Sequence, residues 1–131
     1  MTDIPDMKLE VVPLPVSDVD RARDFYAEKI GFNLDHDSYP SENMRVVQLT
    51  PPGSACSIVM GTGLGDISEM KPGSVKGLHL VVKDVSVVRE MLIGRGVAVG
   101  DIIEYPRGIK IAHFSDPDGN SWELQEIPSN L

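Results

Sequence analysis

Three side chains that could act together chemically are His79, His113 and Glu123. His113 precedes the turn 116–120 at a distance that would place it opposite Glu123 in an antiparallel hairpin. Imidazole nitrogens and carboxylate oxygens bind divalent metals, and they also hydrogen-bond ligands. Two interpretations stay open: a metal site of two histidines and one carboxylate, or histidines that form the polar wall of a ligand cavity or are satisfied within the core.

Without a metal, two roles stay open for Glu123. It could hydrogen-bond a polar group of a ligand, or it could act as a general base whose pKa an apolar cavity raises. The second role needs an acid partner, which His79 or His113 could supply. Trp122 alternates with Glu123, so we expect it on the opposite face of the strand, packed against a helix in the core.

Other side chains are candidates for the mouth and walls of a cavity. Tyr39 and Tyr105 each precede a proline and are expected in loops or at strand ends, where a ring could close over a flat ligand. Arg45 is expected to share a strand face with Val47 and Ser57 and could hydrogen-bond a carbonyl or an anion. For each of these the alternative is an ordinary surface or edge residue. The candidate ligand-binding residues are Tyr39, Arg45, Val47, Ser57, Val59, His79, Tyr105, His113 and Glu123.

The elements that position these residues come from an internal repeat. Short motifs recur at a shift of 66 positions, and twice this shift is essentially the full length of 131 residues. The matching pairs are Val16-Ser-Asp18-Val19 with Val82-Lys-Asp84-Val85, Arg23-Asp24 with Arg89-Glu90, and Pro51-Pro-Gly53 with Pro117-Asp-Gly119. The sequence therefore predicts two copies of one unit.

Each copy predicts a strand, a helix and three more strands. The first helix begins with a capping box at Ser17 and Asp20 or with Asp18 as the cap, and Gly31 ends it in the left-handed conformation. The second helix is expected over 85–95. We expect module 1 over about 8–60, a flexible Gly-rich linker over 61–74 and module 2 over about 75–127, in one domain. The expected strands are 8–16, 32–37, 45–49, 55–60, 75–82, 99–105, 110–114 and 121–127.

Composition excludes several classes of partner. The chain has 12 Lys and Arg against 20 Asp and Glu, a formal net charge of −8, so we expect no nucleic-acid partner. No secretory signal and no apolar window of ~18 residues is present, so we expect no membrane partner. Cys56 is the single cysteine and is expected to be a buried structural thiol, which fits a cytoplasmic location.

Two segments carry a resemblance to a known family. Val12-Pro-Leu-Pro-Val-Ser-Asp-Val-Asp-Arg-Ala-Arg-Asp-Phe-Tyr26, followed by Ile30-Gly-Phe32, resembles the opening of the vicinal oxygen chelate superfamily. Phe114-Ser-Asp-Pro-Asp-Gly-Asn-Ser-Trp-Glu-Leu124 resembles its closing turn and last strand. This group includes glyoxalase I, extradiol dioxygenases and bleomycin-resistance proteins. The resemblance implies an α+β fold of paired βαβββ modules whose curved mixed sheets form a ligand groove, commonly in a homodimer.

The resemblance also implies four strand positions that hold a divalent metal in the enzymes. Transferred onto this sequence, they are Val11, Ser57, Gly77 and Glu123, of which only Glu123 is a competent ligand. One carboxylate cannot hold a catalytic metal that needs three or more protein ligands. His79, two residues past Gly77 and so on the same strand face, could restore a site with His113 and Glu123.

The function predicted from these residues is metal-independent binding of a small organic ligand, such as drug or natural-product sequestration of the bleomycin-resistance type, with no cofactor. The alternative is a glyoxalase-like lyase or isomerase that uses the shifted His79, His113 and Glu123 site or a metal-free acid–base pair. A purely structural or regulatory subunit is a third hypothesis, which no residue supports directly.

Overall fold

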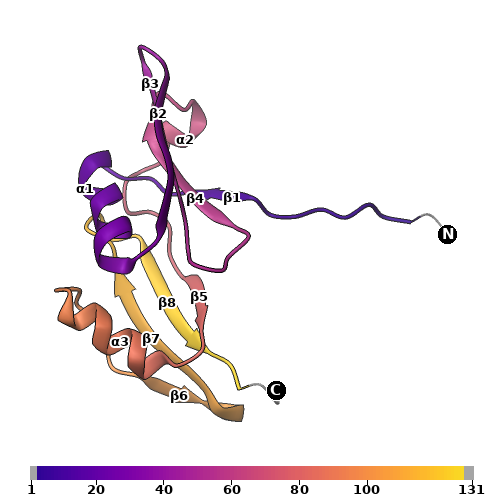
Figure 1. Cartoon of the computed structure of the whole chain (residues 1–131), viewed down its shortest axis with the longest axis vertical. Helices are drawn as coiled ribbons and strands as arrows, with labels where there is room; N and C mark the ends of the chain where they lie inside the picture. Colours follow the sequence, from indigo (N-terminus) through magenta and orange to yellow (C-terminus); the bar gives the residue numbers. More distant parts are fainter. Residues whose placement is uncertain (1–2, 129–131) are drawn as a thin grey trace.

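The chain folds as two βαβββ units, seen in the computed structural model as two separate four-stranded sheets (Figure 1). The structure describes residues 3–128. Module 1 contains β1 (Val11–Pro13), α1 (Val19–Asp24), η1 (Phe25–Ile30), β2 (Asn33–Ser41), β3 (Met44–Thr50) and β4 (Ser57–Thr62). After α2 (Asp66–Glu69), module 2 contains β5 (Leu78–Val82), α3 (Val85–Gly94), β6 (Ile103–Tyr105), η2 (Pro106–Gly108), β7 (Ile109–Ser115) and β8 (Ser121–Glu126).

The two sheets have the same topology. Their strand orders are β1-β4-β3-β2 and β5-β8-β7-β6, so the first strand of each module lies parallel to its last strand and the other neighbours are antiparallel. The predicted α+β class with two tandem βαβββ modules is therefore confirmed. Some bounds differ: β1 is three residues long instead of nine, and β2 continues to Ser41 because it pairs with β3 up to Met44.

Both long helices begin at an aspartate. The Asp18 carboxylate accepts a hydrogen bond from the backbone N–H of Arg21 at 3.0 Å, and Asp84 accepts from Ser86 and Val87 at 3.0 and 3.2 Å. Asp18 is thus the cap of the first helix, because the Ser17 hydroxyl donates instead to Asp118 in module 2 at 2.5 Å. These carboxylates satisfy backbone donors that the first helical turn leaves unpaired.

The connection between the modules is more ordered than predicted. The expected flexible linker over 61–74 contains the end of β4 and the single helical turn α2. The backbone N–H of Leu64 donates to the Ser68 hydroxyl at 2.8 Å, which closes the loop that enters this turn. Gly63 and Gly65 adopt positive φ angles of 69° and 61° there, a conformation that glycine adopts without steric cost.

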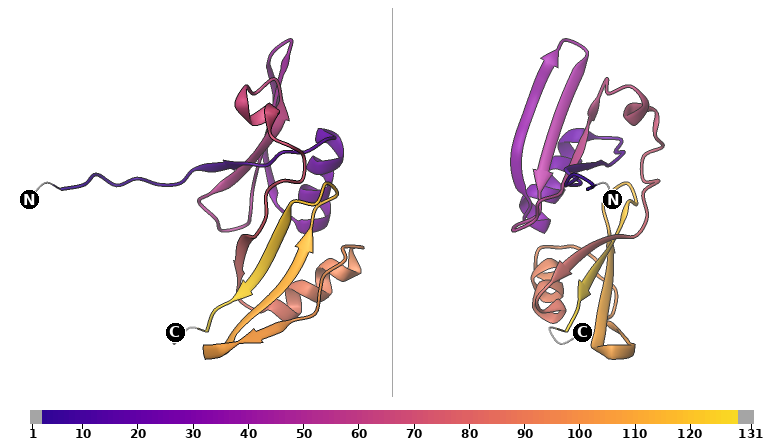
Figure 2. Two further views of the ribbon diagram at one scale, coloured as in Figure 1. Left: turned by 180° about the vertical axis from the view of Figure 1, so that it is seen from behind. Right: turned by 90° about the vertical axis from the view of Figure 1, so that its right-hand side faces the viewer.

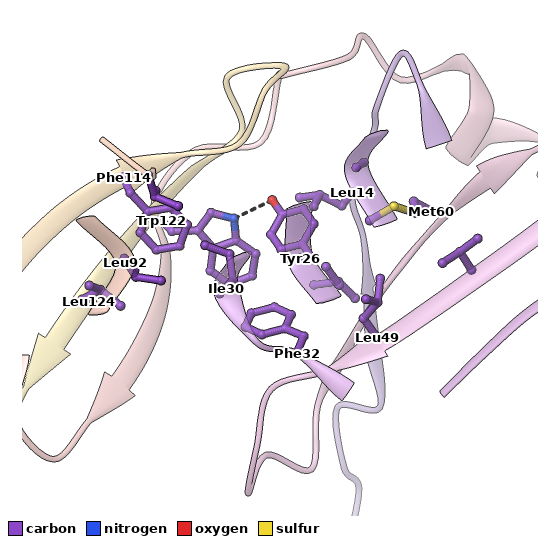
Figure 3. Close-up of a cluster of buried hydrophobic side chains, with 14 of the residues drawn as sticks. Leu14, Tyr26, Ile30, Phe32, Leu49, Met60, Leu92, Phe114, Trp122 and Leu124 are labelled. Carbon is purple, nitrogen blue, oxygen red and sulfur yellow. Dashed lines mark hydrogen bonds between the residues drawn. The ribbon is translucent and has the colours of Figure 1, made fainter. Parts of the chain in front are cut away.

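The hydrophobic core lies between each sheet and its helix and continues from one module to the other (Figure 3). Trp122 is 3% exposed and stacks on Phe114, with ring centroids 6.2 Å apart. Its indole N–H donates to the Tyr26 hydroxyl of module 1 at 2.8 Å, so the prediction that Trp122 packs in the core is confirmed.

The turn before β8 joins the modules by buried hydrogen bonds. The Tyr26 hydroxyl donates to the Asp116 carboxylate at 2.8 Å. The Asn120 side-chain amide donates to Asp116 at 2.9 Å and to the Pro15 carbonyl at 2.8 Å, and its oxygen accepts from the Val75 N–H at 3.1 Å. Burial and the neighbouring Asp116 carboxylate raise the pKa of Tyr26 above its usual range. The phenol therefore stays protonated and serves as the donor in this network.

Candidate ligand-binding site

The face of sheet β5-β8-β7-β6 that points away from α3 carries the predicted polar residues of module 2. Strand pairing sets His79 beside Glu123 across β5 and β8, and His113 beside Glu123 across β8 and β7. The predicted placement of His113 opposite Glu123 is confirmed. The three residues form one row because partners in neighbouring strands point to the same side of a sheet.

The side chains of this row do not all contact one another. His113 Nδ1 lies 3.3 Å from Glu123 Oε1. His79 turns toward the next residue on the same face of β8, and its Nδ1 lies 2.7 Å from Gln125 Oε1. The sequence interpretation missed Gln125, although alternation along β8 places it on the Glu123 face.

These contacts show whether His79, Glu123 and His113 could together bind the divalent metal that the resemblance implies. Within residues 3–128, no three histidine, cysteine, aspartate or glutamate side chains are grouped closely enough to hold a metal ion. His79 faces an amide rather than the carboxylate, and Val11 and Gly77 supply no side-chain donor. The residues present do not fit a catalytic metal, which needs three or more converging protein ligands.

Module 1 holds no ionisable group at the place corresponding to Glu123. There β4 residue Val59 pairs with Gln48 on one side and Pro13 on the other, as Glu123 pairs with the two histidines. The expectation that Ser57 corresponds to Glu123 is wrong. Four residues (54–57) separate the turn glycine from the first helix-facing residue of β4, but only two (120–121) do so in β8.

The expectation that Arg45 and Val47 share a strand face with Ser57 is wrong. Val47 pairs with Met60, which turns it toward the helix, and its side chain is fully buried. The Arg45 guanidinium lies 2.8 Å from Asp37 and 2.7 Å from Asp20. This pairing holds the pKa of Asp37 at about 2. Arg45 therefore joins an ion-pair network on the helix side of the sheet.

The two tyrosines lie toward opposite ends of the folded molecule. Tyr39 is 67% exposed within β2, and its ring faces the Arg45 guanidinium carbon at 5.5 Å. Tyr105 ends β6 opposite Ile109 and is 46% exposed. The β2–β3 hairpin and β6 stand at the two ends of the long axis (Figure 1), so a single chain does not bring both rings to one cavity.

A cavity of about 220 Å³ between the modules unites two of the predicted residues. Ser57 from β4 and His79 from β5 line it, and its apolar wall includes Leu9, Ile58, Leu80 and Trp122. Cys56 lines it as well and is half-buried, not fully buried as expected. A larger hollow of about 700 Å³ between η1 and the segment after α3 has His113 as its one candidate residue among the described lining residues. The smaller cavity is the better candidate site because it brings together two of the predicted residues, one from each module.

The two βαβββ modules, each with its first strand parallel to its last, define a protein of the glyoxalase fold. The model of the Glyoxalase/Bleomycin resistance protein/Dioxygenase superfamily matches residues 8–124, and the chain belongs to this family. A search of curated proteins gave no match.

Several solved structures are similar over nearly the whole chain. TnmS3, an antibiotic-binding protein from Streptomyces sp. CB03234, is 36% identical with a TM-score of 0.84, covering 96% of this chain and 100% of that one. A glyoxalase/bleomycin resistance protein from the same organism is 39% identical with a TM-score of 0.76, covering 89% and 98%. A superfamily member from Sphaerobacter thermophilus DSM 20745 is 32% identical with a TM-score of 0.81, covering 92% and 98%.

Proposed function

We propose that this protein binds a small organic ligand without a metal and sequesters it, as a drug- or natural-product-binding member of its family. The observation that carries the proposal is the cavity between the modules, whose apolar wall holds a few polar groups such as Ser57 and His79. Such a lining is typical of small-molecule sites, in which apolar surface gives affinity and sparse polar groups orient the ligand. The description of TnmS3 as antibiotic-binding supports the same class of ligand.

One contact favours a second candidate, a glyoxalase-like lyase or isomerase that works without metal. His113 Nδ1 and Glu123 Oε1 are 3.3 Å apart on an open face, as an acid–base pair would be. In the binding function, the same pair lies on the open face of the sheet and outside the lining of the cavity.

We also propose a homodimer in the cytoplasm. The open face of module 2 exposes Val81 at 68% and Ile103 at 55%, apolar surface that a second copy would cover. Residues 3–10 run away from the sheets (Figure 2), and Ile4 and Met7 in this segment are 78% and 83% exposed. The lone thiol of Cys56 suits a reducing compartment. Sedimentation equilibrium is expected to give twice the monomer mass of 14.3 kDa, and a monomer at all concentrations would contradict the dimer.

A thermal-shift screen of flat aromatic natural products tests the binding function. A ligand at 100 times its dissociation constant stabilises the fold by about 2.7 kcal/mol. Metal analysis of protein purified without chelator is expected to find no stoichiometric divalent ion, and about one ion per chain would overturn metal independence.

Glu123→Gln separates the two candidates. In the binding function Glu123→Gln leaves ligand affinity unchanged because Glu123 lies outside the cavity lining, whereas loss of a general base abolishes turnover of a small carbonyl substrate. Glu104→Gln in β6 is the matched control, because it makes the same change at an exposed carboxylate of the same sheet that lies outside the histidine row and the cavity. Turnover that Glu123→Gln abolishes and Glu104→Gln preserves would favour the enzyme.

A further inference from the structure

The hydrogen-bond direction at Ser57 can be derived from its neighbours. The Thr50 hydroxyl contacts the Asp35 carboxylate and, at 2.5 Å, the Ser57 hydroxyl. An ionised carboxylate only accepts, so Thr50 donates its single proton to Asp35. The proton in the Thr50–Ser57 bond must then come from Ser57. The same Thr50 hydroxyl holds the pKa of Asp35 below its usual range, which keeps this carboxylate ionised.

Ser57 is left with acceptor capacity only. Its hydroxyl proton is directed to Thr50, and the Gln48 side-chain amide donates to its oxygen at 3.4 Å. A hydroxyl has one proton and two lone pairs, so one lone pair remains. Ser57 therefore presents the cavity with an acceptor rather than a donor.

His79, on the opposite side of the cavity, also presents an acceptor. Its Nδ1 faces the Gln125 carbonyl oxygen at 2.7 Å, and a carbonyl oxygen only accepts. The Nδ1 atom therefore carries the proton. In the neutral ring the free Nε2 is then an acceptor.

The remaining polar side chains of the cavity also donate their hydrogens to other protein groups. The Ser54 hydroxyl donates to the Cys56 carbonyl at 2.9 Å, and the Cys56 thiol donates to the Ser57 carbonyl at 3.7 Å. The Trp122 N–H donates to Tyr26 at 2.8 Å. Among the described side chains that line the cavity, each hydrogen on nitrogen, oxygen or sulfur is thus directed to another protein group.

We propose that this cavity selects ligands that present hydrogen-bond donors, such as phenols, alcohols or amines, over ethers of the same shape. The inference rests on the proposed binding function and specifies the ligand chemistry of that site. Ligand acceptors would meet side-chain acceptors there, and an unpaired buried polar group carries a desolvation cost. A volume of about 220 Å³ is below that of a drug-sized site, so the cavity would hold one end of a larger ligand.

The test compares 2-naphthol, which donates, with 2-methoxynaphthalene, which only accepts, by titration calorimetry on the full chain. The phenol is expected to bind about tenfold more tightly, the scale of one neutral hydrogen bond. Ser57→Ala should weaken 2-naphthol binding severalfold and leave the ether unchanged.

Thr50→Val is the decisive variant because it acts on the proton of Ser57 without touching the cavity. It removes the acceptor that holds this proton, so Ser57 becomes able to donate. The preference for 2-naphthol should fall to about twofold through tighter binding of the ether. Thr62→Val at the far end of β4 is the matched control, and circular dichroism verifies folding.

The outcomes separate the two proposals. Equal affinity for both probes, or a preference that Thr50→Val leaves at tenfold, would overturn donor selection while the binding function stands. Absence of binding by either probe, in a folded protein, would count against the cavity as a site and hence against both.

Discussion

The two modules are alike on the side that faces the helices and different on the side that faces away. Asp18 and Asp84 cap the two helices through the same kind of backbone contact. On the open faces, by contrast, the apolar Val59 of module 1 stands where module 2 has Glu123. The repeated unit has thus kept the features that make it fold, while its open faces have diverged toward different chemistry.

The turns before the last strands of the two modules also differ. In module 2, Asp116 and Asn120 are buried and bond to residues of module 1. In module 1, Pro51 and Ser54 at the equivalent turn line the cavity between the modules. One turn therefore fastens the modules together, and the other forms a wall of the candidate site.

Asn120→Ala should give the largest effect on stability. The change removes three side-chain hydrogen bonds across the buried turn and leaves the half-buried Val75 N–H without its acceptor, while Asp116 and the Pro15 carbonyl each lose one of their donors. We expect the free energy of unfolding in urea to fall by about 3 kcal/mol.

Ser54→Ala at the equivalent position of module 1 is the control. Among residues 3–128, the Ser54 hydroxyl bonds only to Cys56 within its own turn, so the expected loss is under about 1 kcal/mol. Equal losses in the two variants would contradict the idea that one turn fastens the modules and the other does not.

The sequence could predict the fold because its signals are local. The capping aspartates and Gly31, whose φ is 96°, each determine a feature within a few residues of themselves, and the 66-residue repeat extends the pattern of the first module to the second. The placement of His113 opposite Glu123 could also be predicted, since a short turn fixes the register of its hairpin.

The remaining features of the site depend on the pairing register of β4, which follows a turn that is longer than its counterpart in module 2. Two extra residues after Gly53 shift β4, so counting from the glycine selected Ser57 instead of Val59. Arg45 was assigned to the wrong face for a related reason, because a one-residue change in register turns a side chain to the other side of the sheet. The partners of Ser57 and His79 come from neighbouring strands, and no motif in the sequence marks them.

The helix caps should give a smaller effect that is nearly the same in both modules. Asp18→Ala and Asp84→Ala each leave first-turn N–H groups without a side-chain acceptor. We expect each to lower the free energy of unfolding by about 1 kcal/mol in urea titrations. A difference of more than about 1 kcal/mol between the two losses would show that the helix-facing sides of the two modules are not energetically equivalent.

The smallest effect concerns the outer edge of module 1 and depends on pH. Hydrogen bonds from Arg45 and then Arg23 hold the pKa of Asp37 at about 2, against about 3.9 in the unfolded chain. Because the folded pKa is lowered, the ion pair stabilises the protein above about pH 4, and this stabilisation is lost as the pH falls toward 2. Solvent at this edge screens the attraction and limits its size.

Asp37→Asn should lower the thermal midpoint at pH 6, and its midpoint should converge with that of the unmodified protein near pH 2. Asp101→Asn in module 2, whose carboxylate is fully exposed beside Arg89, should leave the pH profile unchanged. If the thermal midpoints of Asp37→Asn and the unmodified protein differ by the same amount at every pH, the ion pairs of Asp37 do not stabilise module 1.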